Sequence, residues 1–433
     1  MKTTGTMPPN RPMTDDEASD KSVQAAIVFS PIGPLSTRGR CLLAVASQIY
    51  AVVDAIAHSG LHVVIFGERG VGKSSLANIT KPLLEVMAQE IQRLVVRVNA
   101  NHQDSFSSVW AKAFDEISFE NDRPVFGFSN TKETERVTLR QAFGVSDHPT
   151  IDEVRRTLAR LPNSVFVIDE FERLPKKYVL QFTDLIKVLS DMAVPSTVIL
   201  VGVADSIDGL VKDHTSIPRA LVQVNMPRMS TAELKEILLK AAEALGMKFD
   251  EDASSRIARM SQGLPHFTHL VGQHSIRNAC DRRSFTVTLA DVDKGFATAV
   301  KQADHTVAET YASAIHSAHS GALFVQVLLA CAVTACLAPD SALGYFQAVD
   351  VVDPLETILN KSVQIATFNG HLTEFVSEKR NKVLERAGVA RAYRYRFHDP
   401  LVPPYIIMRG ITDKLISAAA VETLLNNLTA TEA

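Results

Sequence analysis

The sequence predicts an α/β protein in which helices cover both faces of a parallel sheet. Three features lead to this prediction: short apolar runs alternate with stretches of helical spacing, one run leads into a glycine-rich loop, and another ends in two acidic residues. Runs that stay apolar along their whole length are typical of parallel strands buried on both faces. The predicted strands are residues 63–66, 94–98, 165–168, 197–203 and 221–224.

Length and composition predict an ordinary globular protein with more than one domain. At roughly 100 to 200 residues per domain, a chain of 433 residues should hold two or three domains. A formal net charge of -3 gives no general attraction to nucleic acid or to an anionic membrane, so such binding would need a local patch. The four cysteines are widely spaced and form no CxxC pair, which argues against a disulfide framework or a zinc site and favours a cytoplasmic protein.

Two segments bear on export and on membranes. Residues 1–22 are polar and lack the apolar stretch of a signal peptide, so we expect a disordered tail there. Residues 322–337 are strongly apolar, but they fall short of the roughly 20 residues that a membrane-spanning helix needs. We therefore expect a buried helix there and no contact with a membrane.

The remaining chain divides by texture into three blocks. A core domain covers residues 23–229 and carries an insertion, rich in glycine, proline, asparagine and charge, at about 118–150. A helical lid is expected at 230–305, because Ser230 and Glu233 form a capping box that opens a helix. In the C-terminal block, residues 321–416, three helical stretches precede a paired-strand pattern.

The glycine-rich loop has the spacing GxxxxGK[ST] and lies between a predicted strand and a predicted helix. In such loops backbone N–H groups surround phosphates, the lysine reaches the β and γ phosphates, and the hydroxyl binds magnesium. Lys73 and Ser74 take these two roles, and the alternative is an ordinary glycine-rich turn. The predicted phosphate-binding residues are Gly67, Glu68, Arg69, Gly70, Val71, Gly72, Lys73, Ser74 and Ser75.

The strand at 165–168 delivers Asp169 and Glu170 at its carboxyl end. This position puts Asp169 beside the magnesium ion and Glu170 near the water that attacks the γ phosphate. The alternative is a buried strand that happens to meet an acidic turn. Downstream of a phosphate loop we expect the catalytic arrangement, with Ser74 and Asp169 as metal ligands.

Together these motifs resemble the AAA+ superfamily of P-loop ATPases, in the branch of Orc1/Cdc6-like and transposition-regulator-like ATPases that borders on the STAND signalling ATPases. The resemblance runs from about residue 36 to the C-terminus. It implies ATP and Mg2+ as cofactors, catalytic roles for Lys73, Asp169 and Glu170, slow ATP hydrolysis, and an ATP-dependent oligomer.

The resemblance also implies further site residues, each with a simpler alternative. Asp205, in ILVGVAD, matches the polar γ-phosphate sensor, although a turn aspartate fits as well. Arg219, in HTSIPRALVQV, matches the catalytic arginine that acts on a neighbouring subunit, although a surface arginine fits too. His266, in GLPHFTHL, stands where many relatives have a sensor arginine, and it is either a sensor or a structural histidine. Gly39 and Arg40 match a box near the adenine; alternatively Val45 and Ala46 occupy that place and the box is degenerate.

The C-terminal block resembles the winged-helix domain that Orc1/Cdc6-like ATPases carry after the lid. In RAYRYRF the strand period puts Arg394 and Arg396 on one face and the aromatic residues on the other. Basic residues of such a module can grip duplex DNA; a solvated face or a protein-docking surface is the alternative. The predicted DNA-binding residues are Lys379, Arg380, Lys382, Arg386, Arg394 and Arg396.

Two purposes remain open at this point. In the first, ATP controls oligomerisation and the grip of the winged helix on DNA. In the second, a STAND-like switch or scaffold acts on a protein effector, for example in a defence system, and the insertion at 118–150 is the docking site.

Overall fold

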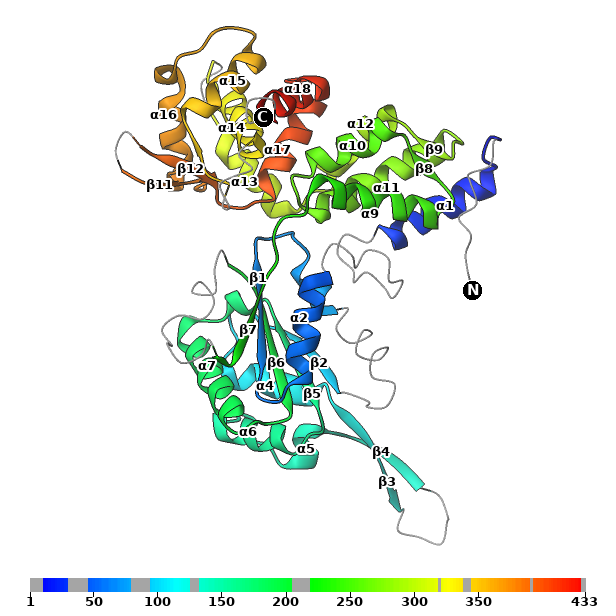
Figure 1. The fold of residues 1–433 in the computed structure, drawn as a ribbon, viewed down its shortest axis with the longest axis vertical. Coiled ribbons are helices and arrows are strands. Elements are labelled where there is room, and N and C mark those ends of the chain that lie inside the picture. The colour runs from blue at the N-terminus through cyan, green and yellow to red at the C-terminus, as the bar shows by residue number, and fades with distance from the viewer. Residues whose placement is uncertain are drawn as a thin grey trace. The chain divides into compact units, whose positions relative to one another are not determined.

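The computed structural model describes residues 11–29, 46–78, 94–124, 132–204, 219–317, 321–337, 344–389 and 392–429, and gives side chains for these except 121–124, 132–135, 337 and 426–429. The chain divides into two compact units (Figure 1). The core unit comprises 33–68 and 72–227, and the lid unit comprises 1–32, 69–71 and 228–433.

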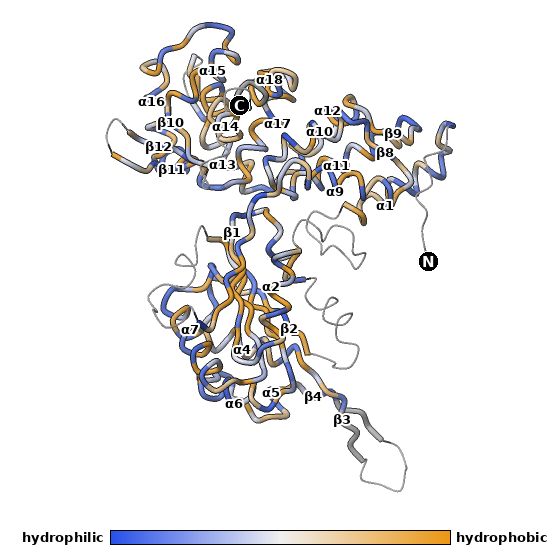
Figure 2. The backbone as a smooth tube through the Cα atoms, in the orientation of Figure 1, coloured by the Kyte–Doolittle hydropathy of each residue, from blue (hydrophilic) through white to orange (hydrophobic). Residues whose placement is uncertain are grey.

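The core unit contains a five-stranded parallel sheet in the order β2-β5-β6-β1-β7. Its central strands β1, β5 and β6 are buried on both faces, and they form the apolar centre of this unit (Figure 2). The predicted parallel sheet is therefore confirmed. The strands are β1 (His62–Gly67), β2 (Val95–Asn99), β5 (Ser164–Asp169), β6 (Ser196–Val203) and β7 (Leu221–Asn225).

Helices pack on this sheet around a group of aromatic side chains. Trp110 of α4 lies against Phe166 of β5, with ring centroids 5.3 Å apart, and close to Phe182 of α7. Helix α2 packs on β1 and β7. Besides α5 (Leu139–Phe143), the helices in the described part of this unit are α2 (Ala46–Ala57), α4 (Phe106–Asp115), α6 (Ile151–Ala159) and α7 (Lys176–Asp191), together with a helix that begins at residue 73 and is described to 78.

The predicted insertion begins as an antiparallel hairpin that extends away from the sheet (Figure 1). Its strands are β3 (Ser118–Pro124) and β4 (Lys132–Thr138), and α5 (Leu139–Phe143) follows. Thr138 caps α5, and Gly144 ends it in the left-handed conformation. The register pairs Glu120 with Arg136, an opposite-charge pair of the kind that stabilises a two-stranded ribbon.

The prediction of a disordered tail at residues 1–22 is wrong for the part of this segment that the structure describes. Helix α1 (Asp15–Val28) starts at Thr14 with a capping box and packs on α11 of the lid unit. Lys21 Nζ donates to the Leu245 carbonyl at 2.6 Å, and the Met13 N–H donates to the Arg283 carbonyl at 3.0 Å. Phe29, directly after the helix, is fully buried.

Four helices, α9 to α12, occupy the segment that was predicted to be a helical lid. The capping box of Ser230 and Glu233 is present at the start of α9. Arg256 of α10 pairs with Asp293 of α12 and Glu422 of α18, each at 3.0 Å, and so ties three helices together. The elements are α9 (Thr231–Ala244), β8 (Lys248–Phe249), α10 (Glu251–Met260), α11 (Pro265–Asp281), β9 (Thr286–Val287) and α12 (Leu289–Lys301).

The C-terminal block of this unit surrounds α14, and the residues of α14 from 327 to 333 are all buried. The predicted buried helix at 322–337 is confirmed, and in the described part of the chain no helix is long and apolar enough to cross a membrane. The helices are α13 (His305–Ile315), α14 (Phe324–Leu337), α15 (Val352–Leu359), α16 (Ile365–Phe375), α17 (Val402–Thr412) and α18 (Ala418–Thr429).

A small antiparallel sheet in the order β10-β12-β11 completes this block. Within β12, Arg394 is exposed whereas Tyr395 and Phe397 are buried, which confirms the predicted alternation of the strand. The strands are β10 (Phe346–Gln347), β11 (Leu384–Ala387) and β12 (Arg394–Phe397), with 3-10 turns at Val349–Val351 and Glu378–Arg380.

Candidate nucleotide site

The glycine-rich loop begins where β1 ends, at Gly67. A side chain at this position would collide with the carbonyl oxygen of Met226, and the backbone has a φ of 151° that favours glycine. Gly72, with a φ of 99°, turns the chain into the next helix, whose first turn closes through a 3.0 Å bond from Leu76 N–H to the Gly72 carbonyl. The loop therefore has the strand–loop–helix setting that its motif requires.

Lys73 is the first residue of that helix, and its side chain folds back onto the loop. Its Nζ donates to the carbonyls of Gly67 at 3.0 Å and Glu68 at 2.6 Å, and the residue is only 7% exposed. These bonds hold the ammonium against the loop. Ser74 beside it is exposed, Ser75 is half-buried, and Val71 is buried.

The tip of the loop, residues 69–71, groups with the lid unit. Within that unit Arg69 forms ion pairs with Asp399 at 2.8 Å and Asp304 at 3.0 Å. The pKa of Asp304 is lowered, first by its bond from the Thr306 N–H and then, against some desolvation, by the charge of Arg69.

Asp169 ends β5 as a buried carboxylate, 4% exposed, with both oxygens engaged. Its Oδ1 accepts the N–H of Glu170 at 2.8 Å, and its Oδ2 accepts from Arg97 Nη2 at 2.5 Å. The same guanidinium donates through Nη1 to Oδ1 of Asn78, on the helix that starts at Lys73. Arg97 therefore connects the two predicted motifs, the acidic strand end and the phosphate loop.

Sequence reasoning did not single out Arg97. The available signal was a lone charged residue inside an otherwise apolar strand, VVRVN, but that signal does not tell which partner the charge meets.

Glu170 lies in a different environment from its neighbour. Its side chain is 38% exposed, and it forms a 3.3 Å ion pair with Arg173 of the 3-10 turn Phe171–Arg173. Its backbone is left-handed, with a φ of 56°. Non-glycine residues in this conformation cost roughly 1 kcal/mol or more and are common at functional sites. One carboxylate is thus withdrawn from water and the other is open to it.

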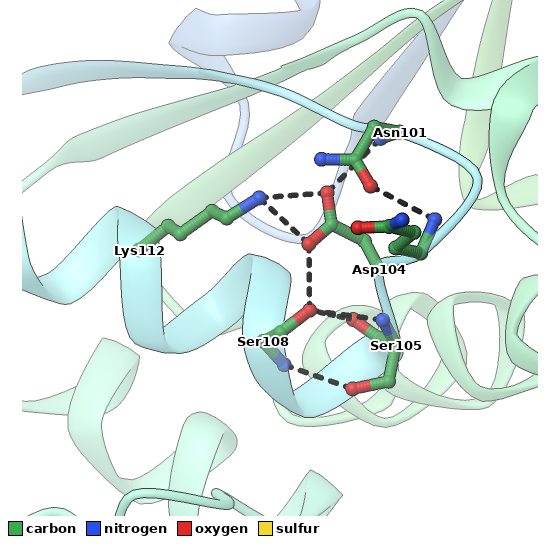
Figure 3. Close-up of polar contacts among 6 residues, drawn as sticks. Asn101, Asp104, Ser105, Ser108 and Lys112 are labelled. Carbon is green, nitrogen blue, oxygen red and sulfur yellow. Dashed lines mark hydrogen bonds and ion pairs between the residues drawn. The ribbon is translucent and has the colours of Figure 1, made fainter.

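The loop after β2 lies beside Asp169, because the Ala100 N–H donates to the backbone carbonyl of Asp169 at 2.8 Å. A buried carboxylate, Asp104, fixes this loop (Figure 3). It accepts from the Asn101 N–H at 3.0 Å, from Ser108 Oγ at 2.8 Å and from Lys112 Nζ at 2.6 Å. The edge of the sheet that carries Asp169 is therefore held by a satisfied polar network.

The other predicted site residues fall in three places. Asp205, Gly39 and Arg40 lie outside the described residues. Arg219 is exposed and lies two residues before the start of β7, whose Leu221 pairs with His62 at the amino end of β1. His266 is half-buried in the first turn of α11, in the lid unit, with its ring 5.2 Å from that of Phe267.

A magnesium ion fits the residues of this site only when a nucleotide shares it. The described residues contain no group of three or more histidine, cysteine, aspartate or glutamate side chains arranged to hold a metal by themselves. Magnesium commonly takes one or two protein ligands and completes its shell with phosphate and water oxygens. The Ser74 hydroxyl and the Asp169 carboxylate are ligands of that kind.

The basic residues of the C-terminal block have unequal roles. Arg380 is only 9% exposed, donates to the Ala314 carbonyl at 3.2 Å, pairs with Glu374 at 3.1 Å and lies 3.7 Å from the Phe324 ring centroid. As a DNA-binding residue Arg380 was therefore a wrong prediction, because its guanidinium is satisfied inside the fold. Arg396 pairs with Glu385 at 2.8 Å and Lys382 with Glu378 at 2.5 Å. Of the six predicted DNA-binding residues, Lys379, Arg386 and Arg394 are exposed and form no ion pair with another described residue.

The sequence pattern of the family described as Novel STAND NTPase 1 matches residues 46–330. The chain belongs to this family. The matched range contains the glycine-rich loop and both acids at the end of β5, and the family supports the predicted resemblance to AAA+ ATPases that border on STAND ATPases. No curated protein matches this STAND NTPase.

Solved structures resemble this STAND NTPase at low sequence identity. A Walker-type ATPase of Pyrococcus abyssi is 14% identical with a TM-score of 0.50, over 88% of this chain and 99% of that one. Orc1 of Aeropyrum pernix, solved in complex with DNA, is 15% identical with a TM-score of 0.44, over 90% and 94%. Orc2 of the same organism is 15% identical with a TM-score of 0.46, over 93% and 98%.

Proposed function

We propose that this STAND NTPase binds ATP together with Mg2+ and hydrolyses it slowly, as the switch of a nucleotide-controlled protein. The observation that carries the proposal is the chain of contacts from the phosphate-loop helix through Asn78 and Arg97 to Asp169. These contacts support one site in the core unit, between the helix that begins at Lys73 and the acidic end of β5.

Each residue of the site has a chemical task that its environment supports. Lys73 would neutralise the β and γ phosphates, and Ser74 and Asp169 would hold the metal, which supplies further positive charge when bound. Glu170 would orient the attacking water, because it is the one of the two acids that is open to solvent. We assign Asp205 and His266 no step, since their contribution is proposed from the resemblance alone.

Replacement of Lys73 by alanine tests the proposal. We expect Lys73→Ala to abolish binding of a fluorescent ATP analogue, because the phosphates lose their main cation. Lys176→Ala, a surface lysine at the start of α7, is the matched control and should bind as the wild type does. Equal nucleotide affinity in Lys73→Ala and the control would remove the loop from this role.

We propose further that the ATP-bound protein assembles and that Arg219 acts on the nucleotide of a neighbouring subunit. Arg219 precedes the amino end of β7, whereas the phosphate loop follows the carboxyl end of the parallel strand β1. A strand of this length separates the two ends by about 20 Å, which supports action in trans. Mass photometry with a non-hydrolysable ATP analogue tests this: a strict monomer at every concentration rules out a trans-acting arginine.

Regarding its target, we propose that the C-terminal block is a winged helix that engages a protein effector. Its order α14-β10-α15-α16-β11-β12 supports the winged-helix interpretation. The helix in the recognition position, α16, contains no lysine or arginine, and its exposed residues include Thr367, Asn369 and Thr373. A helix that enters a DNA groove usually contacts phosphates through basic residues, so a helix without lysine or arginine supports a protein target.

Duplex DNA is the second candidate, and the exposed cations Lys379, Arg386 and Arg394 favour it. Fluorescence anisotropy on a random duplex at several salt concentrations tests it, with a log-log slope of about -0.9 per phosphate neutralised. Replacing Arg386 and Arg394 together by alanine should flatten the slope by up to ~2 units. Arg396→Ala should change it less, because Arg396 already pairs with Glu385. Absence of binding at ~50 mM salt by the ATP-bound protein excludes DNA and leaves the effector.

A further inference from the structure

We infer that Arg97 is a built-in counter-ion for the metal-binding carboxylate, and that Mg-nucleotide must break the Arg97–Asp169 ion pair to bind. This inference rests on the proposed function, because it concerns the same site. It assigns Arg97 a positioning role: its guanidinium pairs with Asp169 in the structure and would be displaced by a metal ion at that carboxylate.

The position of Arg97 in the sheet makes the contact possible. Strand β2 lies at the edge of the sheet and pairs in parallel with β5, so that Asn99 stands beside Asp169 and Arg97 two residues earlier. Adjacent strands carry their side chains on the same face in register, and the long arginine side chain reaches forward to the end of β5. Its Nη2 lies 2.5 Å from Asp169 Oδ2.

Both oxygens of Asp169 are occupied by donors, one by the Glu170 N–H and one by Arg97. The carboxylate is almost fully buried, so it needs a positive partner in the nucleotide-free protein. A guanidinium is a fixed cation that cannot lose its proton to make way. Arg97 and a magnesium ion would compete for the same negative charge, and each lowers the affinity of the other.

The other terminal nitrogen of the Arg97 guanidinium contacts the helix that follows the phosphate loop. Arg97 Nη1 donates to Oδ1 of Asn78 on that helix, which begins at Lys73. While the pair with Asp169 is intact, β5 and the phosphate-loop helix are held together by one planar side chain. Metal binding at Asp169 would release Arg97 from its partner and change the restraint on that helix.

If Arg97 has a simpler role, its removal should change the contribution of magnesium to nucleotide binding in the opposite direction. If Arg97 only orients Asp169 toward the metal, its removal weakens the contribution of magnesium to nucleotide binding. If Arg97 competes, its removal strengthens that contribution. The quantity that separates the two roles is the ratio of the nucleotide Kd in EDTA to the Kd in saturating magnesium, measured by titration of a fluorescent ATP analogue.

The test compares the full-length wild type with Arg97→Met, which keeps the length and removes the charge, and Arg97→Lys, which keeps the charge. We expect the ratio to rise roughly five-fold or more in Arg97→Met, in the range of coupling between linked sites, and to stay near the wild-type value in Arg97→Lys. An unchanged or smaller ratio in Arg97→Met overturns the inference, even if that variant is less stable.

Asn78→Ala provides a second test of the inference in case Arg97→Met does not fold. It leaves the Arg97–Asp169 pair in place but removes the second anchor of the guanidinium, so the ratio should rise by a smaller factor. An unchanged ratio in Asn78→Ala, when Arg97→Met does not fold, overturns the inference. If the wild type binds no nucleotide in either buffer, the proposed function fails, and the inference fails with it. If the wild type binds and only the ratios do not rise, the inference alone fails.

Discussion

His62 should make the stability of the core unit depend on pH. It begins β1, is fully buried, and its Nδ1 accepts the N–H of Val198 at 3.0 Å. Its Nε2 is buried with no hydrogen-bond partner in the described structure. Burial lowers the pKa of His62 from 6.5 to about 4, because a charged imidazole would lose its hydration there.

The direction and the size of this pH dependence follow from the lowered pKa of His62. The unfolded chain takes up the proton at a higher pH than the folded chain does. The contribution to stability is therefore complete above the unfolded pKa and is lost as the pH falls from 6.5 toward about 4. The full loss is about 3 kcal/mol, at 1.36 kcal/mol per unit of pKa, and about 2 kcal/mol of it falls between about pH 7.5 and about pH 5.

His62→Asn is the informative variant, because asparagine can still accept the Val198 N–H but cannot titrate. Trp110 is the only tryptophan of the chain and is buried in the core unit, so its emission during denaturant unfolding reports on this unit. The wild type should lose about 2 kcal/mol more than the variant between the two pH values. Carboxylates that titrate in both proteins cancel in this difference. Equal pH dependence in the two proteins would refute the reasoning.

Two further predictions concern charged side chains that the fold uses structurally. Lys112→Met should destabilise the core unit by about 1 kcal/mol in the same assay, because Asp104 stays buried without its cation, while Lys187→Met on an exposed face of α7 should not. Arg380→Met should destabilise the lid unit by on the order of 3 kcal/mol, because Glu374 and the Ala314 carbonyl lose their donor. Calorimetry measures this loss, and replacement of the neighbouring exposed Lys379 by methionine is the control that should be near neutral. No difference between Arg380→Met and its control would contradict the structural role of Arg380.

The core sheet could be predicted from the sequence because its central strands β1, β5 and β6 are apolar almost without interruption. Such runs, one of them followed by a glycine loop, leave few alternatives to a parallel sheet, and the five strands appear close to where they were expected. The glycine-rich loop and the acidic pair could be singled out from motif spacing and from the strands that precede them, because Lys73 and Asp169 match motifs with fixed chemistry. Their roles at a nucleotide stay predictions.

The features that were missed depend on partners distant in the sequence. Helix α1 packs through the small side chains of Ala18 and Ala25, which give no strong apolar pattern in a polar segment. Arg380 looked like part of a basic surface because its neighbours are charged, and only the fold reveals the carbonyls that it binds. The pairing of Arg97 with Asp169 joins residues 72 positions apart, and no local pattern indicates it.

Single-turnover ATP hydrolysis by Glu170→Gln, measured beside nucleotide binding, tests the central claim most directly. The site predicts that this variant binds ATP with the affinity of the wild type, because Lys73, Ser74 and Asp169 are unchanged. It also predicts that hydrolysis slows roughly a hundredfold or more, because the attacking water loses its orienting carboxylate. Hydrolysis at the wild-type rate by Glu170→Gln would contradict the account.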